Sequence, residues 1–124
     1  MKDVILWQRL EGALVFVAGL AMVPLAGADL PWWLMFVAFF APDLSFLAYG
    51  LGPRIGALGY NLVHLYAFGL GLFVLGLLLA SPLAAALGAL WLAHSGFDRM
   101  LGYGLKSAES FHQTHLGPIG RRRS

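Results

Sequence analysis

Residues 94–106 read HSGFDRMLGYGLK and close the last of four long apolar segments in the chain. This stretch places His94, Asp98 and Arg99 within two helical turns, although the chain is 60% hydrophobic and only 11% charged. A charged side chain inside a bilayer carries a large free-energy penalty, so it normally has a partner and a function. The stretch therefore predicts a membrane segment with a candidate functional site near its end.

The composition excludes an ordinary soluble domain. A length of 124 residues allows one domain, and the mean hydropathy of +0.77 is typical of a protein whose solvent is a bilayer. The chain has no cysteine, which excludes disulfides and thiolate metal sites. Three of the eight basic residues form the run 121–123 and the rest lie near segment ends, which predicts contact with a membrane surface and no nucleic-acid partner.

Four apolar segments are separated by short breaks rich in glycine, proline or polar residues. Each segment is long enough to cross a hydrocarbon core of about 30 Å as a helix. Pro42 interrupts the second segment and predicts a kink or break beside Asp43. The segments cover residues 4–25, 31–51, 55–80 and 83–105.

The basic residues predict the orientation of these helices. Arg9 lies near the N-terminus, Arg54 in the second connection and Lys106 after the last segment, whereas the first and third connections contain no Lys or Arg. Four crossings with both termini in the cytoplasm satisfy the positive-inside rule. We therefore predict an all-α, four-helix integral membrane bundle over residues 1–106, followed by a cytoplasmic tail at 107–124.

The first segment has an alternative interpretation as a signal peptide. Ala26-Gly27-Ala28 has the small residues of a cleavage site. Glu11 interrupts the region that a signal peptide keeps apolar, and this favours a membrane helix.

The ionisable residues of the four segments lie at similar predicted depths. With a helical rise of about 1.5 Å per residue, Glu11 and Asp98 lie about 10 Å and Asp43 about 12 Å from the cytoplasmic ends of their segments. His64 and His94 lie about 14 and 16 Å from those ends. Because the outer half is nearly free of polar side chains, this layer predicts a polar chamber that opens to the cytoplasm.

The chamber residues are a ligand set for a divalent metal ion. His94 and Asp98 are four residues apart and share a helix face. Imidazole and carboxylate together suit zinc, manganese or iron. We predict Asp43, His64, His94 and Asp98 as ligands, with Glu11 as a further ligand, and Glu11 or Asp98 as the general base for a metal-activated water.

A second set of residues is predicted to bind the head group of a lipid or amphiphile. Its cations would hold a phosphate or another anion, and its neutral members lie near the chamber. The set consists of Arg9, Tyr60, Asn61, Arg99, Tyr103, Lys106 and His115.

Packing roles remain open as alternatives for several of these residues. Asp98 and Arg99 would form an interfacial ion pair with Arg99 reaching the surface. His64 would bond Asn61 or a tyrosine, and Glu11 would pair with a nearby arginine.

Other functions remain open as well. Ionisable residues inside a bundle also mark proton or ion pathways, which would make the protein a small transporter, working as a homo-oligomer. A haem held between His64 and His94 is disfavoured by the neighbouring Asp43 and Asp98. A non-catalytic membrane protein is a further alternative.

The motifs resemble a bacterial membrane family catalogued as domain of unknown function 4260. The resemblance covers nearly the whole chain and implies a multi-pass protein of the bacterial inner membrane. It is carried by the stretches PDLS at 42–45, GPRIG at 52–56, YNLVH at 60–64 and HSGFDR at 94–99, and by THLG at 114–117 in the tail.

A weaker likeness is to the membrane-bound metal-dependent hydrolases of the bacterial inner membrane. Those proteins also carry a Pro-Asp pair, a later histidine and a His-x-x-x-Asp, which here correspond to Pro42-Asp43, His64, and His94 with Asp98. The chain departs from that pattern because it has only residues 61–64 where those proteins carry a His-Arg-Gly-x-x-His-Ser stretch, so one ligand is missing or is supplied by Glu11 or His115. The likeness implies a metal-dependent hydrolase that acts on a lipid or amphiphile.

Overall fold

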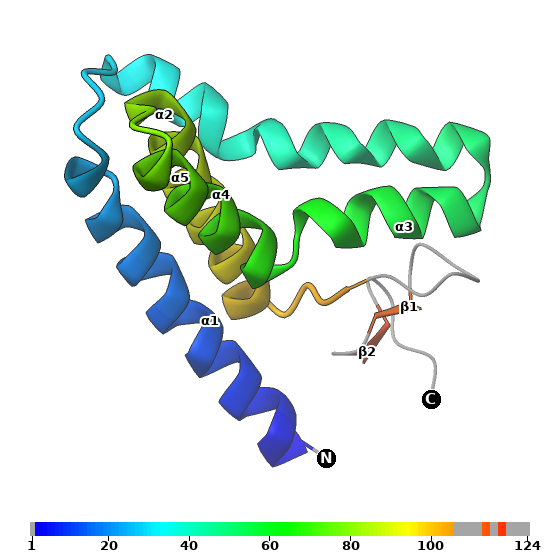
Figure 1. Cartoon of the computed structure of the whole chain (residues 1–124). Helices are drawn as coiled ribbons and strands as arrows, with labels where there is room; N and C mark the ends of the chain where they lie inside the picture. Colours follow the sequence, from blue (N-terminus) through cyan, green and yellow to red (C-terminus); the bar gives the residue numbers. More distant parts are fainter. Residues whose placement is uncertain (1, 106–112, 115–116, 119–124) are drawn as a thin grey trace.

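The computed structural model describes residues 2–105, 113–114 and 117–118, and this part of the chain is almost entirely helical (Figure 1). Besides the connecting turns and loops, the described residues include a pair of two-residue strands, β1 (Gln113–Thr114) and β2 (Gly117–Pro118), which pair antiparallel. The helices are α1 (Lys2–Met22), η1 (Pro24–Ala26), α2 (Trp32–Phe40), η2 (Ala41–Leu51), α3 (Pro53–Val63), α4 (Tyr66–Leu78) and α5 (Pro82–Leu101), where η denotes a 3₁₀-helix.

Helix α5 is the centre of the fold. It packs along its length against α1 on one side and α4 on another, and α2 contacts it as well. The 3₁₀-helix η2 and α3 pack against each other as a hairpin that extends away from these helices (Figure 1). The polar residues of the predicted chamber are therefore distributed between the central helix and the base of this hairpin.

Small residues allow the neighbouring helices to approach α5 closely. A Cβ atom added at Gly12 of α1 would lie 2.8 Å from the carbonyl oxygen of Gly96, and one added at Gly19 would lie 2.7 Å from the nitrogen of Ala93. On α4, a Cβ atom at Gly69 would lie 2.5 Å from the nitrogen of Leu92. Such small-residue contacts are the usual means of helix association in a bilayer, where burial of apolar surface gives little driving force.

The ends of α5 follow local sequence signals. Ser81 accepts a hydrogen bond from the nitrogen of Ala84 (3.3 Å), and Pro82 occupies the first turn. At the other end Gly102 has a φ of 96°, and Tyr103 donates its N–H to the carbonyl of Asp98 (2.8 Å). This glycine cap ends the helix at residue 101, four residues before the predicted end of the segment.

The predicted break at Pro42 is confirmed. Proline has no N–H to donate to the carbonyl of Ala38, four residues earlier, so the α-helical pattern cannot continue. The carbonyl of Ala38 instead accepts the N–H of Ala41, three residues on, and the indole N–H of Trp91 at 2.9 Å. The chain then continues as η2, and Asp43 lies at its beginning.

The third segment is not one continuous helix, which corrects the prediction of a single helix over residues 55–80. Helix α3 ends at Val63, the backbone of Leu65 is extended, and α4 begins at Tyr66 at an angle of 48°. The segment contains no proline at this point, so the sequence pattern does not indicate the break. A contact made by Arg99, described below, provides the physical reason.

Two described helical stretches, Lys2–Ala26 and Trp32–Leu51, are long and apolar enough to cross a membrane. The bent pair α3 and α4 adds a third if it acts as one span. Helix α5 is not among them, because the polar residues in its second half lower its hydropathy. Four crossings and cytoplasmic termini therefore stay predictions.

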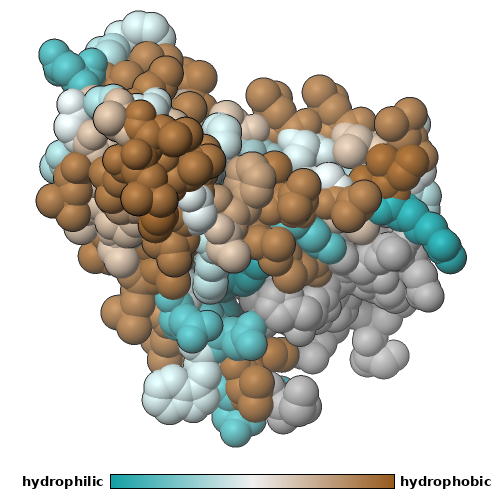
Figure 2. Space-filling view, viewed as in Figure 1, coloured by the Kyte–Doolittle hydropathy of each residue, from teal (hydrophilic) through white to brown (hydrophobic). Residues whose placement is uncertain are grey.

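The outer surface agrees with a membrane environment. Large apolar side chains such as Leu14, Trp32, Leu47 and Leu78 are exposed. Figure 2 shows that hydrophobic residues dominate the visible face, while hydrophilic residues gather near the N-terminal end of α1 and at the far end of the η2–α3 hairpin. A surface this apolar is suited to contact with lipid.

Glycine substitutions on α4 test the close packing against α5. We expect Gly69→Ala to lower the free energy of unfolding by about 1–3 kcal/mol, because the added methyl group meets the backbone of Leu92. Gly71→Ala is the matched control, since nothing lies within 4 Å of a Cβ atom there. Thermal unfolding in detergent should show a lower Tm for Gly69→Ala alone; equal Tm values for the two variants would contradict the packing.

Candidate metal centre

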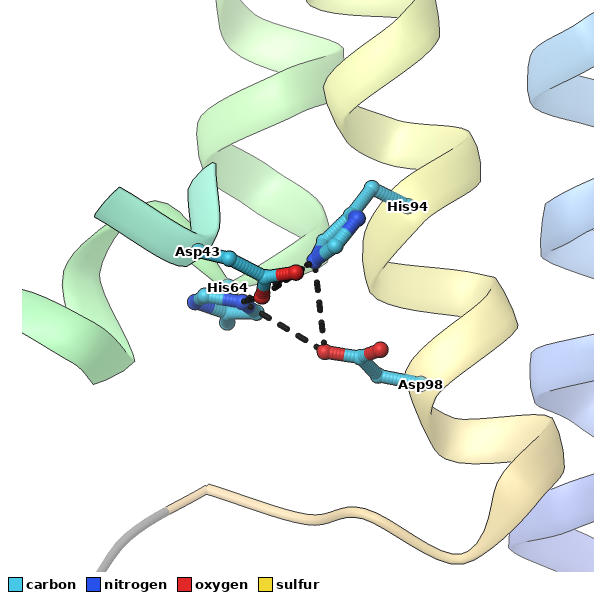
Figure 3. A group of neighbouring side chains, drawn as sticks. All are labelled: Asp43, His64, His94 and Asp98. Carbon is cyan, nitrogen blue, oxygen red and sulfur yellow. Dashed lines mark hydrogen bonds and ion pairs between the residues drawn. The ribbon is translucent and has the colours of Figure 1, made fainter. Parts of the chain in front are cut away.

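Four side chains from three elements converge on one point (Figure 3). Asp43 comes from η2, His64 follows the last residue of α3, and His94 and Asp98 lie one turn apart on α5. One ligand atom from each residue lies within 4.8 Å of the corresponding atoms of the other three. We call these four residues the His/Asp group. The structure thus brings together four of the predicted ligands, whereas Glu11, predicted as a further ligand, is not among them.

Five of the separations between these atoms are close to those in a metal's coordination shell. The Nε2 atoms of His64 and His94 are 3.2 Å apart, and Oδ1 of Asp43 lies 3.5 and 3.1 Å from them, respectively. Oδ2 of Asp98 lies 3.4 and 3.3 Å from the same two nitrogens. Ligands at about 2.0–2.2 Å from a tetrahedral zinc ion are separated from one another by roughly 3.3–3.6 Å. One ion would therefore fit among these atoms with little rearrangement.

The orientation of His64 is set by its own helix. Its Nδ1 atom lies 2.7 Å from the backbone carbonyl oxygen of Tyr60, which can only accept a hydrogen bond. Nδ1 therefore donates, and in the neutral ring the lone pair of Nε2 points into the His/Asp group. The ring of Tyr60 stacks on the imidazole at 3.8 Å with an interplanar angle of 10°. A hydrogen bond from the second ring nitrogen to a backbone carbonyl is a usual way in which proteins orient a metal-binding histidine.

His94 is held differently. Its Nε2 atom points to the His/Asp group, whereas its buried Nδ1 has no hydrogen-bond partner within the described part of the chain. The rings of Phe39 and Phe40 lie edge-on to the imidazole, at 5.2 and 6.0 Å between centroids. Aromatic packing, and not a backbone carbonyl, therefore positions this ring.

The charges of the group require a cation. With neutral imidazoles, Asp43 and Asp98 bring two negative charges within 4.8 Å of each other. Asp98 is buried, and its Oδ2 accepts a long hydrogen bond of 3.5 Å from the hydroxyl of Tyr60 and lies 3.3–3.4 Å from the two imidazole Nε2 atoms. Buried carboxylates are costly unless they are paired or bind a metal. Either protonation of a histidine or a bound divalent ion would balance this charge.

Arg99 is close in sequence but contacts another part of the site. Its guanidinium donates to the backbone carbonyl of His64 at 3.1 Å and lies over the ring of Tyr66, 5.3 Å from its centroid. A cation at the C-terminal end of a helix also interacts favourably with the helix dipole. This contact stabilises the break between α3 and α4 and holds His64 in place.

The burial of Arg99 corrects one alternative. At 5% exposure the residue does not reach the surface, as the alternative of an interfacial ion pair requires. Its predicted role in head-group binding stays a prediction.

The other predicted residues lie outside the His/Asp group. Glu11 is exposed on α1 and is not among the converging ligands, so its catalytic role stays a prediction. Arg9 is also exposed on α1 and donates to the backbone carbonyl of Met100 at 2.9 Å, at the end of α5. Asn61 is half-buried on α3, and Tyr103 is exposed after α5.

Two predicted head-group residues, Lys106 and His115, lie outside the described residues. Tyr60, another member of the head-group set, contacts two of the metal ligands. Its hydroxyl donates to Asp98, and its ring stacks on His64.

Sequence reasoning missed the residues that support the ligands. Phe39 packs against His94, and Tyr66 packs against Arg99. Trp91 donates to the carbonyl of Ala38 that the break at Pro42 leaves without its α-helical partner. Among these residues, the sequence pattern singles out Trp91 alone. It lies three residues before His94, so the two side chains are neighbours on one face of the helix.

These features define a helical membrane protein with a buried cluster of histidines and carboxylates between its helices. The chain belongs to the family described as domain of unknown function (DUF4260), which matches residues 5–119. No curated protein and no solved structure matches it.

Replacement of Arg99 tests its structural role. We expect Arg99→Met to lower the free energy of unfolding by about 1.5–3 kcal/mol, because a charge-assisted hydrogen bond to a buried carbonyl is lost. Arg9→Met removes a similar bond at an exposed position and is the control, with a smaller expected effect. Thermal unfolding in detergent measures both, and equal losses would contradict the role of Arg99 in holding the helix break.

Proposed function

We propose that the His/Asp group binds one divalent metal ion and that the protein is a membrane-embedded, metal-dependent hydrolase acting on a lipid or amphiphile. The observation that carries the proposal is the convergence of two imidazole nitrogens and two carboxylate oxygens at 3.1–3.5 Å. Mixed nitrogen and carboxylate ligands favour zinc, manganese or iron.

The donor set does not suit haem. A haem iron takes its two imidazoles from opposite faces of the porphyrin ring. Here the two Nε2 atoms are 3.2 Å apart, and both carboxylates converge on the same point. A porphyrin ring would have no space between the two histidines.

The unequal burial of the ligands suggests a division of roles. His64, His94 and Asp98 are buried, whereas 51% of the Asp43 side chain is exposed. Catalytic zinc sites typically use three protein ligands and leave the fourth position to water. Within the His/Asp group, the three buried residues would hold the ion, and the more exposed Asp43 would lie beside the water.

This position also makes Asp43 a better general base than Glu11 or Asp98. Metal binding would make a coordinated water easier to deprotonate near neutral pH. Asp43 would take a proton from the water as the water oxygen attacks the carbon of an ester or the phosphorus of a phosphoester. The bond to the leaving oxygen breaks, and the same proton passes to that oxygen.

Elemental analysis of the purified protein tests the metal proposal. We expect about one divalent ion per chain in the wild-type protein and loss of the ion in His64→Ala and His94→Ala. Glu11→Gln is the control and should keep the ion, because Glu11 lies outside the His/Asp group. Acidification to about pH 5 should release the ion as protons compete for the ligands. Metal-free wild-type protein at neutral pH would overturn the proposal.

The variant Asp43→Asn separates catalysis from metal binding. We expect it to keep the ion and to hydrolyse ester or phosphoester lipids at least about 100-fold more slowly, because it loses the base. Loss of the ion from this variant would instead make Asp43 a fourth ligand.

A transporter is the second candidate, and one observation favours it. The chain is broken beside two of the ligands, at Pro42 next to Asp43 and at His64 itself. Transporters often bind ions at such discontinuous helices. Metal or proton flux into liposomes that contain the protein, abolished in His94→Ala, would favour transport over hydrolysis.

A further inference from the structure

An apolar groove runs along α5 next to the His/Asp group. It has a volume of about 570 Å³, which lies within the roughly 300–1,000 Å³ that is usual for small-molecule sites. Its walls are α1, η1, α2 and α5, and its lining consists of apolar and aromatic side chains. Along α1 and the residue that follows it, the lining extends from Phe16 to Val23, a distance of about 10 Å at the helical rise.

One end of the groove adjoins the metal ligands. Phe16, Phe39 and Phe97 meet there, with ring centroids 5.2–6.1 Å apart. Phe39 also lies edge-on to the imidazole of His94 at 5.2 Å, so one ring both lines the groove and contacts a ligand. Leu90 and Phe97, which line the groove on α5, lie one turn before and one turn after His94.

We propose that this groove binds a single hydrocarbon chain and places the polar end of that amphiphile at the His/Asp group. The inference rests on the proposed function, because it assigns the substrate's apolar part. It identifies the substrate class as amphiphiles that carry a hydrocarbon chain, with Phe16, Phe39 and Phe97 against the end of that chain nearest the head group.

The lining indicates a hydrocarbon chain in preference to a peptide or a polar ligand. The described lining contains no charged residue, so backbone amides of a bound peptide would find few hydrogen-bond partners. Two of the walls, α1 and α2, belong to the stretches that are long and apolar enough to cross a membrane. A groove between such helices would face the acyl chains of the membrane lipids.

Photolabelling in lipid nanodiscs tests this site. The probe is a sixteen-carbon alcohol with a diazirine at about the fifth carbon from its hydroxyl, present at low mole fraction. We expect labels on Met35 and on the buried Leu90, and we expect excess unlabelled hexadecanol to reduce this labelling at least about fivefold. Labels on the outer faces of the helices, which bulk lipid covers, should not be reduced by the competitor.

Two tryptophan variants provide the matched comparison. Leu20→Trp fills the groove and should remove the competed labels, whereas Val17→Trp, at a 63% exposed position on the same helix outside the lining, should keep them. Met35→Trp fills the opposite wall and should act like Leu20→Trp. The Tm of each variant shows that it is folded.

The outcomes separate the groove from the proposed function. Uncompeted labelling spread over all helix faces, or crosslinking that shows a second copy of the chain seated in the groove, would overturn the chain-binding site. Competed labelling in a protein that contains no metal would support the site and count against the metal-dependent hydrolase. Metal with no competed labelling would keep the proposed function and reject the groove.

Discussion

Two imidazoles and two carboxylates meet at hydrogen-bonding distances inside a protein whose surface is apolar, and most of the structure serves to keep them there. Three of the four side chains are buried. A charged group in such surroundings is tolerated only when neighbouring groups offset its loss of hydration. The stacking of Tyr60 on His64, the carbonyl that accepts from Nδ1 of His64 and the aromatic contacts of His94 all hold the ligands in place.

The placement of α5 makes this burial possible. Its polar half would be costly in contact with lipid, and α1 and α4 cover it on both sides. Helices can approach this closely only where side chains are small, which explains the glycines and alanines along both contacts. The same helix carries Arg99, whose contact with the carbonyl of His64 joins the packing of the core to the geometry of the site.

The two helix breaks have different physical causes. Pro42 ends the α-helical pattern of its segment through its own covalent structure, and Trp91 satisfies the carbonyl that is left exposed. The break at His64 is a tertiary effect, because a buried guanidinium from another helix bonds the carbonyl at the end of α3. Both breaks allow the η2–α3 hairpin to leave the α1–α4–α5 core and bring Asp43 and His64 to the centre from its base.

The sequence by itself determined the helical class, the membrane character, the break at Pro42 and the four residues of the His/Asp group. These follow from hydropathy, from the chemistry of proline and from the rarity of His and Asp in apolar segments, all of which are local properties. Only the tertiary structure decided that Glu11 stays outside the group, that Arg99 is buried, and that the third segment bends at His64. Those outcomes depend on contacts between residues 35 or more positions apart, such as that of Arg99 with His64, which no periodicity in the chain records.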